Sequence, residues 1–416
     1  MSKLVINGGR QLGGRIRVQG SKNSSLPILA ASLLTDERCV IHNCPDISDT
    51  RTAIDILRGF GADAERSGDC VSVCTRNMSG RIINPELMQK MRSSVMFTGA
   101  VLGRCGEAII CPPGGCRLGE RPIDMHISSL TRLGANIEIM GECIACRLKE
   151  VCSDDIFLIY PSVGTTENIM LMCAASGREV RIFNPAREPE IVDLQNFLNL
   201  MGADIRGAGG DLIKICPSGR LHGCEYTVMP DRIAVSTIAC ATAACGGDVF
   251  IDGAEADHIQ LVTAVLKEIG CDVSQGSGGI GIRSTGKPKA VNMIKTLPYP
   301  GFPTDAQPLL GAVLTRADGV SKMCETIFDN RFGYLKELEK MGADISVSGS
   351  NAEIRGKAEI YGADVAAGDL RGGAALVVAG LAAFGTTAIS GLEYIDRGYE
   401  KIEDTFKKLG ADILRI

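Results

Sequence analysis

The chain has 416 residues, of which 45% are hydrophobic and 22% charged, a balance typical of globular proteins with ample core material. The net charge of −5, from 44 basic and 49 acidic residues, excludes a general cationic surface for nucleic acid, and an aromatic content of 4% without Trp disfavours base stacking. The sequence contains neither a signal-like apolar run nor a span of bilayer length, so we expect a cytoplasmic protein without membrane association whose 17 cysteines are free thiols.

A cationic helix start lies near the N-terminus. Residues 20–25 read GSKNSS and precede the strongly helical segment LPILAASLL. Ser21 or Asn23 can cap that helix, and Lys22 stands beside its N-terminus, where N–H groups attract phosphate or carboxylate. For this segment taken alone, an ordinary capped helix with a solvated lysine is the simpler interpretation.

The loop at residues 112–127, PPGGCRLGERPIDMHI, carries the most informative chemistry. Two glycines let the backbone bend sharply before Cys116, and Arg117 and Arg121 follow closely. Neighbouring guanidinium charges favour a thiolate and attract anions. This pattern indicates acid–base or covalent chemistry on a phosphorylated or carboxylated substrate. The alternative is a structural cysteine, since the chain contains 16 others.

A second anion-facing helix start follows at residues 160–166, YPSVGTT. The pattern predicts a helix over 167–175 whose backbone amides could hold a diphosphate. Simple capping by Ser162 is the alternative.

Three acidic positions in the C-terminal half stand beside special features. Asp305 lies in the proline-rich loop PYPGFPTDAQ, where a rigidly held acid could act as a general base or cap the next helix. Asp369 and Asp396 each lie close to an arginine, Arg371 and Arg397. These arginines could form structural ion pairs or clamp a carboxylate or phosphate.

A repeated phrase organises the whole chain. A helical apolar pattern, then a glycine, then strand-like alternation recurs at Gly61, Gly134, Gly202, Gly270, Gly342 and Gly410, at intervals of 73, 68, 68, 72 and 68 residues. Each glycine is predicted to end its helix in a left-handed conformation. A unit of about 70 residues holds helices on a small mixed sheet and must share its core with neighbouring units.

The repeat predicts an α/β fold with two lobes of three units each. We expect an inside-out α/β barrel in each lobe, with helices buried and sheets outward. The predicted lobes are residues 21–229, which carry the Cys116 loop, and residues 1–20 plus 230–416, with the active site in the cleft between them. The segment 372–385, rich in Gly and Ala, is expected to be a close-packed internal helix.

The spacing of the cysteines and histidines does not indicate a metal site. Cys143 and Cys146 come nearest to a zinc pattern, but the alternation around them predicts a strand, and the four histidines are scattered. We therefore expect neither a metal nor a cofactor.

Taken together, the motifs resemble the UDP-N-acetylglucosamine 1-carboxyvinyltransferase family over essentially the full length. The motifs that carry the resemblance, in chain order, are GSKNSSLPILAASLL, PPGGCRLGERPIDMHI, PSVGTTENIM, GFPTDAQ, ETIFDNRF and DRGYEKIED. The resemblance implies transfer of the enolpyruvyl group of phosphoenolpyruvate to the 3′-hydroxyl of UDP-N-acetylglucosamine, with release of phosphate. This is the first committed step of peptidoglycan synthesis. It also implies a fold of two lobes, each with three repeated α/β units.

The resemblance further implies roles for individual residues. Cys116 would be the proton donor and Asp305 the general base, while Lys22 and Arg397 would act with Arg121 on the phosphate and carboxylate. The implied substrate-binding set is Lys22, Asn23, Arg92, Arg121, Pro122, Ile123, Asp124, Met125, Ser162, Val163, Gly164, Asp305, Ile327, Arg371 and Arg397. Fosfomycin, which mimics phosphoenolpyruvate and alkylates the loop cysteine of the family, should inhibit the protein.

The sequence also departs from the family. Tyr160 and Pro161 precede the serine where some relatives carry a basic residue, and Met96 stands where some carry an aromatic residue.

Other functions remain open. A 3-phosphoshikimate 1-carboxyvinyltransferase shares the fold but lacks the Pro-Gly-Gly-Cys loop. A catalytically weak paralogue could bind UDP-N-acetylglucosamine and regulate wall synthesis through protein partners. A purely structural repeat protein would have no need of a cationic loop with a cysteine.

Overall fold

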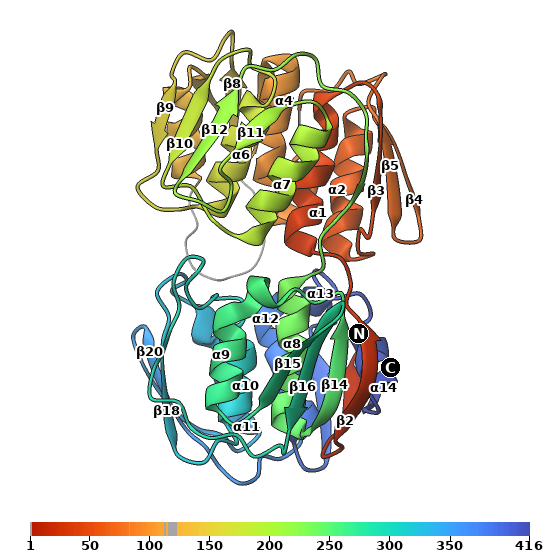
Figure 1. Cartoon of the computed structure of the whole chain (residues 1–416), viewed down its shortest axis with the longest axis vertical. Coiled ribbons are helices and arrows are strands. Elements are labelled where there is room, and N and C mark those ends of the chain that lie inside the picture. Colours follow the sequence, from red (N-terminus) through yellow and green to blue (C-terminus); the bar gives the residue numbers. More distant parts are fainter. Residues whose placement is uncertain (1, 83, 112–113, 115–122) are drawn as a thin grey trace. The chain divides into compact units, whose positions relative to one another are not determined.

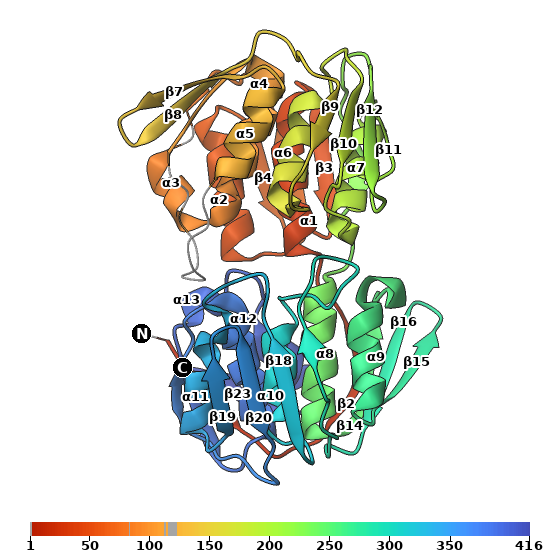
Figure 2. The same ribbon diagram turned by 90° about the vertical axis from the view of Figure 1, so that its left-hand side faces the viewer.

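The computed structural model describes residues 2–82, 84–111, 114 and 123–416. Their contacts divide the described chain into two compact units (Figures 1 and 2). Unit 1 comprises residues 2–19 and 230–416, and unit 2 comprises the described residues between 20 and 229. None of the helices in the described part of the chain is long and apolar enough to cross a membrane.

Unit 2 contains three small sheets and their helices. In strand order, the sheets are β13 (Glu225–Thr227), β3 (Arg38–His42), β5 (Cys70–Cys74) and β4 (Asp63–Ser67); β6 (Glu107–Ile110), β8 (Cys143–Arg147) and β7 (Asn136–Met140); and β9 (Asp155–Phe157), β10 (Val180–Phe183), β12 (Leu212–Cys216) and β11 (Asp204–Arg206). The helices are α1 (Lys22–Ala31), η1 (Ser32–Leu34), α2 (Ser48–Gly59), α3 (Pro85–Lys90), η2 (Arg92–Met96), α4 (Phe97–Cys105), α5 (Asp124–Arg132), α6 (Val163–Cys173) and α7 (Pro189–Leu200).

Unit 1 is built in the same way. Its sheets are β2 (Leu12–Arg17), β14 (Gly247–Asp252), β16 (Gly279–Ser284) and β15 (Asp272–Gly276); β17 (Ile294–Lys295), β18 (Val320–Cys324), β20 (Asn351–Arg355) and β19 (Asp344–Ser348); and β21 (Asp364–Ala366), β22 (Thr386–Ser390), β1 (Leu4–Asn7) and β23 (Asp412–Arg415). The helices are α8 (Arg232–Cys245), η3 (Ala256–Ile259), α9 (Gln260–Glu268), α10 (Gln307–Leu314), η4 (Arg331–Tyr334), α11 (Leu335–Lys340), α12 (Leu370–Ala382), α13 (Leu392–Ile395) and α14 (Ile402–Lys408).

Five of the six sheets have one topology, a parallel pair followed by two antiparallel partners. The sheet with β6 differs, because its parallel contact is reduced to a bridge between Ile82 and Ile109. Strands distant in sequence complete three of the sheets: β13 pairs with β3, β2 with β14, and β1 with β22. Each unit is therefore closed by its own terminal segments.

The six repeat glycines share one conformation. Their φ angles lie between 89° and 105°, a region that side chains disfavour. The N–H of each glycine donates to the carbonyl three residues earlier, and the N–H of the following residue donates to the carbonyl five residues earlier. Gly270, for example, donates to Lys267, and Cys271 donates to Leu266. The predicted left-handed helix ends are thus confirmed, and each one turns the chain directly into a strand.

Three buried helices lie at the centre of each unit. In unit 1, α8, α10 and α12 contact one another, and in unit 2 α1, α4 and α6 do so (Figures 1 and 2). Every residue of α12 is buried, which confirms the internal helix predicted from the Gly- and Ala-rich segment. Small residues are required there, because a Cβ at Gly373 would meet Ile395 at 2.6 Å.

Two predictions of local structure were wrong. Cys111 and Cys143 form a disulfide, because the antiparallel pairing of Ile110 with Ile144 sets these two cysteines opposite each other, with Cα atoms 4.1 Å apart. Fourteen other cysteines in the described residues are free, as expected.

Helix α6 begins at Val163 rather than at residue 167, because Ser162 caps it by accepting from the N–H of Thr165.

Substituting Gly270 tests the helix-ending glycines. No atom lies within 4 Å of a Cβ at this position, so Gly270→Ala should destabilise unit 1 through backbone strain alone, by about 1–2 kcal/mol. Urea unfolding monitored by circular dichroism measures the effect. The control is Gly59→Ala, in α2 and also open to a Cβ but without a positive φ, which should not destabilise the protein. Equal stability of Gly270→Ala and the wild type would contradict the account.

Candidate active site

The predicted phosphate-binding lysine is part of a buried ion pair. Lys22 is the first residue of α1, and its Nζ lies 2.8 Å from Asp49 Oδ2 on α2, with both side chains almost completely buried. Ser21 caps α1 by accepting from the Ser24 N–H, which confirms the expected cap. The expectation of a solvated lysine was wrong, because the side chain of Lys22 is buried against Asp49. Asn23 lies in the same first turn. The pair holds a cation at a helix N-terminus, a position that favours anions.

Asn168 connects the predicted nucleotide-binding elements of unit 2. Its Oδ1 accepts from the Gly99 N–H at 2.7 Å, and its Nδ2 donates to the Val95 carbonyl at 3.1 Å and lies 2.7 Å from His126 Nδ1. Helices α4, α5 and α6 and the turn η2, which begins with Arg92, are thereby fixed to one another.

His126 is held as a neutral donor. Because Asn168 donates to Nδ1, the imidazole proton is assigned to Nε2. Burial lowers the pKa of His126 to about 4, and the nearby charge of Arg92 adds to this shift. The ring packs on Gly164, where a Cβ would lie 3.1 Å from Cε1 and 3.5 Å from Nε2. The imidazole therefore stands at the start of α6, beside Ser162, Val163 and Gly164.

The first turn of α6 presents backbone amides at a helix N-terminus. Ser162 accepts from the Thr165 hydroxyl at 3.0 Å as well as from its N–H, and Val163 and Gly164 are only partly buried. N–H groups in the first turn have no intrahelical acceptor and favour an anion. Asp124 and Met125 begin α5 directly after Ile123, and Asp124 is exposed.

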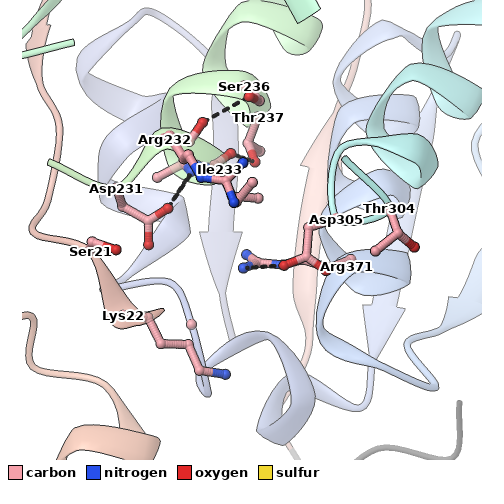
Figure 3. Close-up of polar contacts among 12 residues, drawn as sticks. Ser21, Lys22, Asp231, Arg232, Ile233, Ser236, Thr237, Thr304, Asp305 and Arg371 are labelled. Carbon is pink, nitrogen blue, oxygen red and sulfur yellow. Dashed lines mark hydrogen bonds and ion pairs between the residues drawn. The ribbon is translucent and has the colours of Figure 1, made fainter. Parts of the chain in front are cut away.

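In unit 1, two buried guanidinium groups hold the carboxylate of Asp305. Arg331 Nη2 donates to Oδ1 at 2.9 Å and Arg371 Nη2 donates to Oδ2 at 3.2 Å (Figure 3 shows Arg371 pointing at Asp305). The side chain of Asp305 is 28% exposed, whereas those of Arg331 and Arg371 are 1% and 4% exposed, so a ligand can reach the acid but not the arginines behind it. Asp305 does not cap α10, whose N-cap is Ala306.

Neighbouring groups stabilise the buried charge of Arg371. Burial lowers the pKa of Arg371, but the neighbouring Asp305, Tyr399 and Asp231 together outweigh it, so the pKa is raised overall. Arg331 also donates to Thr304 Oγ1 at 3.1 Å and lies over the ring of Phe328. The carboxylate of Asp305 is therefore held in a fixed orientation, with one guanidinium donor on each oxygen.

The same cluster fixes the turn that carries Ile327. Both oxygens of Glu325 accept from the Thr304 hydroxyl at 3.1 Å, and Oε1 accepts from the N–H groups of Ile327 at 2.8 Å and Phe328 at 3.2 Å. The structure thus brings Ile327 and Asp305 together.

The Asp–Arg neighbours of the sequence do not pair as expected. Asp396 binds Arg415 through both oxygens, at 2.9 and 2.7 Å, because β23 presents Arg415 to this turn. Asp369 caps α12 and receives Arg331 at 3.5 Å. Arg371 Nη1 lies 3.4 Å from the hydroxyl of Tyr399, two residues beyond Arg397.

Cys116, Arg121 and Pro122 lie outside the described residues. The remaining predicted site residues form two groups, one in each unit. Unit 2 holds Lys22, Asn23, Arg92, Ile123, Asp124, Met125, Ser162, Val163 and Gly164, and unit 1 holds Asp305, Ile327, Arg371 and Arg397. Among the described residues, no cluster of three His, Cys, Asp or Glu side chains could hold a metal ion.

Five residues that organise these groups were not predicted as site residues from the sequence: Asp49, His126, Asn168, Glu325 and Arg331. Asp49 had a usable signal, because it falls at helical spacing on the apolar stripe with Ala53 and Ile56. A charge on a buried stripe requires a partner. Arg331 had no such signal, because Asp305 lies 26 residues away in sequence and Asp369 belongs to another repeat.

Stability at acidic pH tests the environment of His126. Its pKa is lowered on folding, so the unfolded chain binds more protons between pH 6.5 and 4, and stability must fall as pH falls through this range. Between pH 7.5 and pH 5 the loss is about 2 kcal/mol. We expect urea unfolding of His126→Gln to lack this component, whereas the exposed control His222→Gln should retain it. A pH dependence unchanged by His126→Gln would contradict the assignment.

Comparisons with known proteins show the family of the chain. The family model of EPSP synthase (3-phosphoshikimate 1-carboxyvinyltransferase) matches residues 6–406. The chain is 49% identical over 416 residues, all of both chains, to "UDP-N-acetylglucosamine 1-carboxyvinyltransferase 2" of Caldanaerobacter subterraneus subsp. tengcongensis. It is 45% identical to "UDP-N-acetylglucosamine 1-carboxyvinyltransferase 1" of Carboxydothermus hydrogenoformans, over 100% of this chain and 99% of that one.

Solved structures agree as well. The enolpyruvyl transferase NikO of Streptomyces tendae superposes with a TM-score of 0.90 at 26% identity, covering 100% of this chain and 98% of the other. An EPSP synthase of Acinetobacter baumannii, at 17% identity, has a TM-score of 0.77 over both complete chains, which supports the fold alone. The chain belongs to the enolpyruvyl transferase family and, within it, groups with the UDP-N-acetylglucosamine 1-carboxyvinyltransferases.

Proposed function

We propose that this protein transfers the enolpyruvyl group of phosphoenolpyruvate to the 3′-hydroxyl of UDP-N-acetylglucosamine and releases phosphate. The observation that carries the proposal is the 49% identity to a relative of that name over the complete length of both chains. In the cell this reaction would be the first committed step of peptidoglycan synthesis, and the expected location is the cytoplasm.

We further propose that each unit is an inside-out barrel of three repeats, with helices inside and sheets outside. Three sheets per unit, three mutually contacting central helices and the six equivalent glycines support this architecture. The lobe boundaries near residues 20 and 229 would then place the linkers beside Lys22 and Asp231.

The positive groups suit phosphoenolpyruvate, which carries about three negative charges near neutral pH. Lys22, Arg121 and Arg397 would bind its phosphate and carboxylate, with Arg92 nearby. The burial of Lys22 supports this role, because a cation in a low-dielectric site attracts an anion more strongly than one in water.

The nucleotide would contact three groups of residues. The Arg121–Met125 turn, together with Asn23, would hold the nucleotide, and Ser162, Val163 and Gly164 would supply amides to its diphosphate. Asp305 and Ile327 would contact the sugar. Arg371, which lies behind Asp305, would act through that carboxylate.

The chemistry would proceed by addition and elimination. Cys116 would protonate the methylene carbon of phosphoenolpyruvate as the sugar 3′-oxygen bonds to the adjacent carbon, and Asp305 would receive the hydroxyl proton. The resulting phospho-ketal would lose a proton from the new methyl group and expel phosphate. The two guanidinium donors fix the orientation of Asp305, and this positioning would contribute to the proton transfer.

No cofactor or metal is required by this scheme. The expected partners are the two small-molecule substrates, and protein partners would be needed only if the chain were a regulatory paralogue.

Phosphate release tests the proposed function. Purified protein with phosphoenolpyruvate should release phosphate when UDP-N-acetylglucosamine is added, and not when shikimate 3-phosphate is added. Release with shikimate 3-phosphate alone would instead assign 3-phosphoshikimate 1-carboxyvinyltransferase activity. A folded protein that binds the nucleotide without releasing phosphate would favour a regulatory paralogue.

Substituting Cys116 tests the proposed acid. Cys116→Ala should lower kcat by at least about a hundredfold, because general acid catalysis is lost. Cys116→Asp should retain turnover and resist fosfomycin, because a carboxylic acid can donate a proton but is a poor target for an epoxide. Cys152→Ala, which removes an exposed cysteine, is the control. Full activity of Cys116→Ala would refute the role.

A further inference from the structure

The turn that carries Arg397 is braced on several sides. Asp396 is held by Arg415, and the hydroxyl of Tyr399 lies 2.8 Å from Thr237 Oγ1. Gly398 packs closely against α12, since a Cβ there would lie 2.7 Å from a methyl carbon of Leu370. Lys401, two residues beyond Tyr399, has a φ of 44°, a left-handed conformation that needs support from its surroundings.

The side-chain amide of Gln19 forms hydrogen bonds to this turn with both its nitrogen and its oxygen. Nε2 donates to the Gly398 carbonyl at 3.0 Å, and Oε1 accepts from the Glu400 N–H at 2.9 Å. The two bonds lie on either side of Tyr399 and begin one residue beyond Arg397. A primary amide can donate and accept at once, whereas a carboxylate can only accept and a hydrocarbon can do neither.

Gln19 also occupies a special place in the chain. It is the last residue of unit 1 before the chain passes to unit 2 at Gly20. Its carbonyl accepts from the N–H of Asp231, which lies on the returning segment, at 3.0 Å. The backbone of Gln19 is therefore fixed to one connecting segment while its side chain is fixed to the Arg397 turn.

We propose that Gln19 is a positioning residue that fixes Arg397 for binding the phosphate or carboxylate of phosphoenolpyruvate. The proposal rests on the function proposed above for Arg397. A guanidinium group on a loose turn must be ordered when the anion binds, and a braced turn avoids that entropic cost. The loss of the brace should therefore weaken the binding of phosphoenolpyruvate specifically.

Steady-state kinetics of Gln19→Met and Gln19→Glu tests this role. Met keeps the length of the side chain but forms neither bond, so the KM for phosphoenolpyruvate should rise about tenfold, while kcat and the KM for UDP-N-acetylglucosamine stay within about twofold. Glu keeps the acceptor for the Glu400 N–H and should give a smaller rise. The matched control is Gln275→Met on the exposed strand β15, which should match the wild type.

Hydrogen exchange supplies a readout that is independent of substrates. The amide of Glu400 should exchange faster in Gln19→Met than in the wild type or in Gln275→Met. Unchanged exchange, an unchanged KM for phosphoenolpyruvate, or an equal loss for both substrates would overturn the proposal. If the wild type itself released no phosphate, the proposed function would fail, and unchanged Glu400 exchange would still overturn the brace.

Discussion

The site depends on burying charged groups together with fixed partners of opposite charge. An unpaired charge in a protein interior is prohibitively costly, and Lys22 is accordingly buried beside Asp49, Arg331 beside Asp305 and Asp369, and Arg371 beside Asp305. The partners fix the orientation of the charged groups as well as neutralising them, because each carboxylate oxygen of Asp305 accepts from its own guanidinium donor. The positions of these groups are therefore set before any ligand binds, as catalysis by preorganised electrostatics requires.

The repeated fold makes these pairs possible. In every repeat a glycine ends a helix and turns the chain into a strand. Three of the predicted site residues lie at the starts of central helices: Lys22 begins α1, Ser162 caps α6, and Asp305 precedes α10. The closing of each unit by its own terminal segments also explains why Gln19 reaches a turn almost 400 residues away in sequence.

Local patterns predicted much of this arrangement. The glycine spacing predicted six units, the Gly- and Ala-rich segment predicted a buried helix, and the motifs predicted the family. The partners of the charged residues could not be predicted, because Asp305 lies 26 residues from Arg331 and Asp369 meets Arg331 only after two repeats pack together. The disulfide of Cys111 with Cys143 was missed for the same reason, since it depends on a strand register that the spacing of cysteines does not reveal. The role of Cys116 rests on the motif alone.

Mass spectrometry of the nucleotide after incubation with phosphoenolpyruvate tests the central claim most directly. The account predicts UDP-N-acetylglucosamine carrying an enolpyruvyl ether at the 3′-oxygen, formed in equal amount to the phosphate released. Asp305→Asn, which keeps the shape of the acid but removes the anion, should form this product far more slowly. A nucleotide recovered unchanged from a folded wild-type protein that binds both substrates would contradict the account.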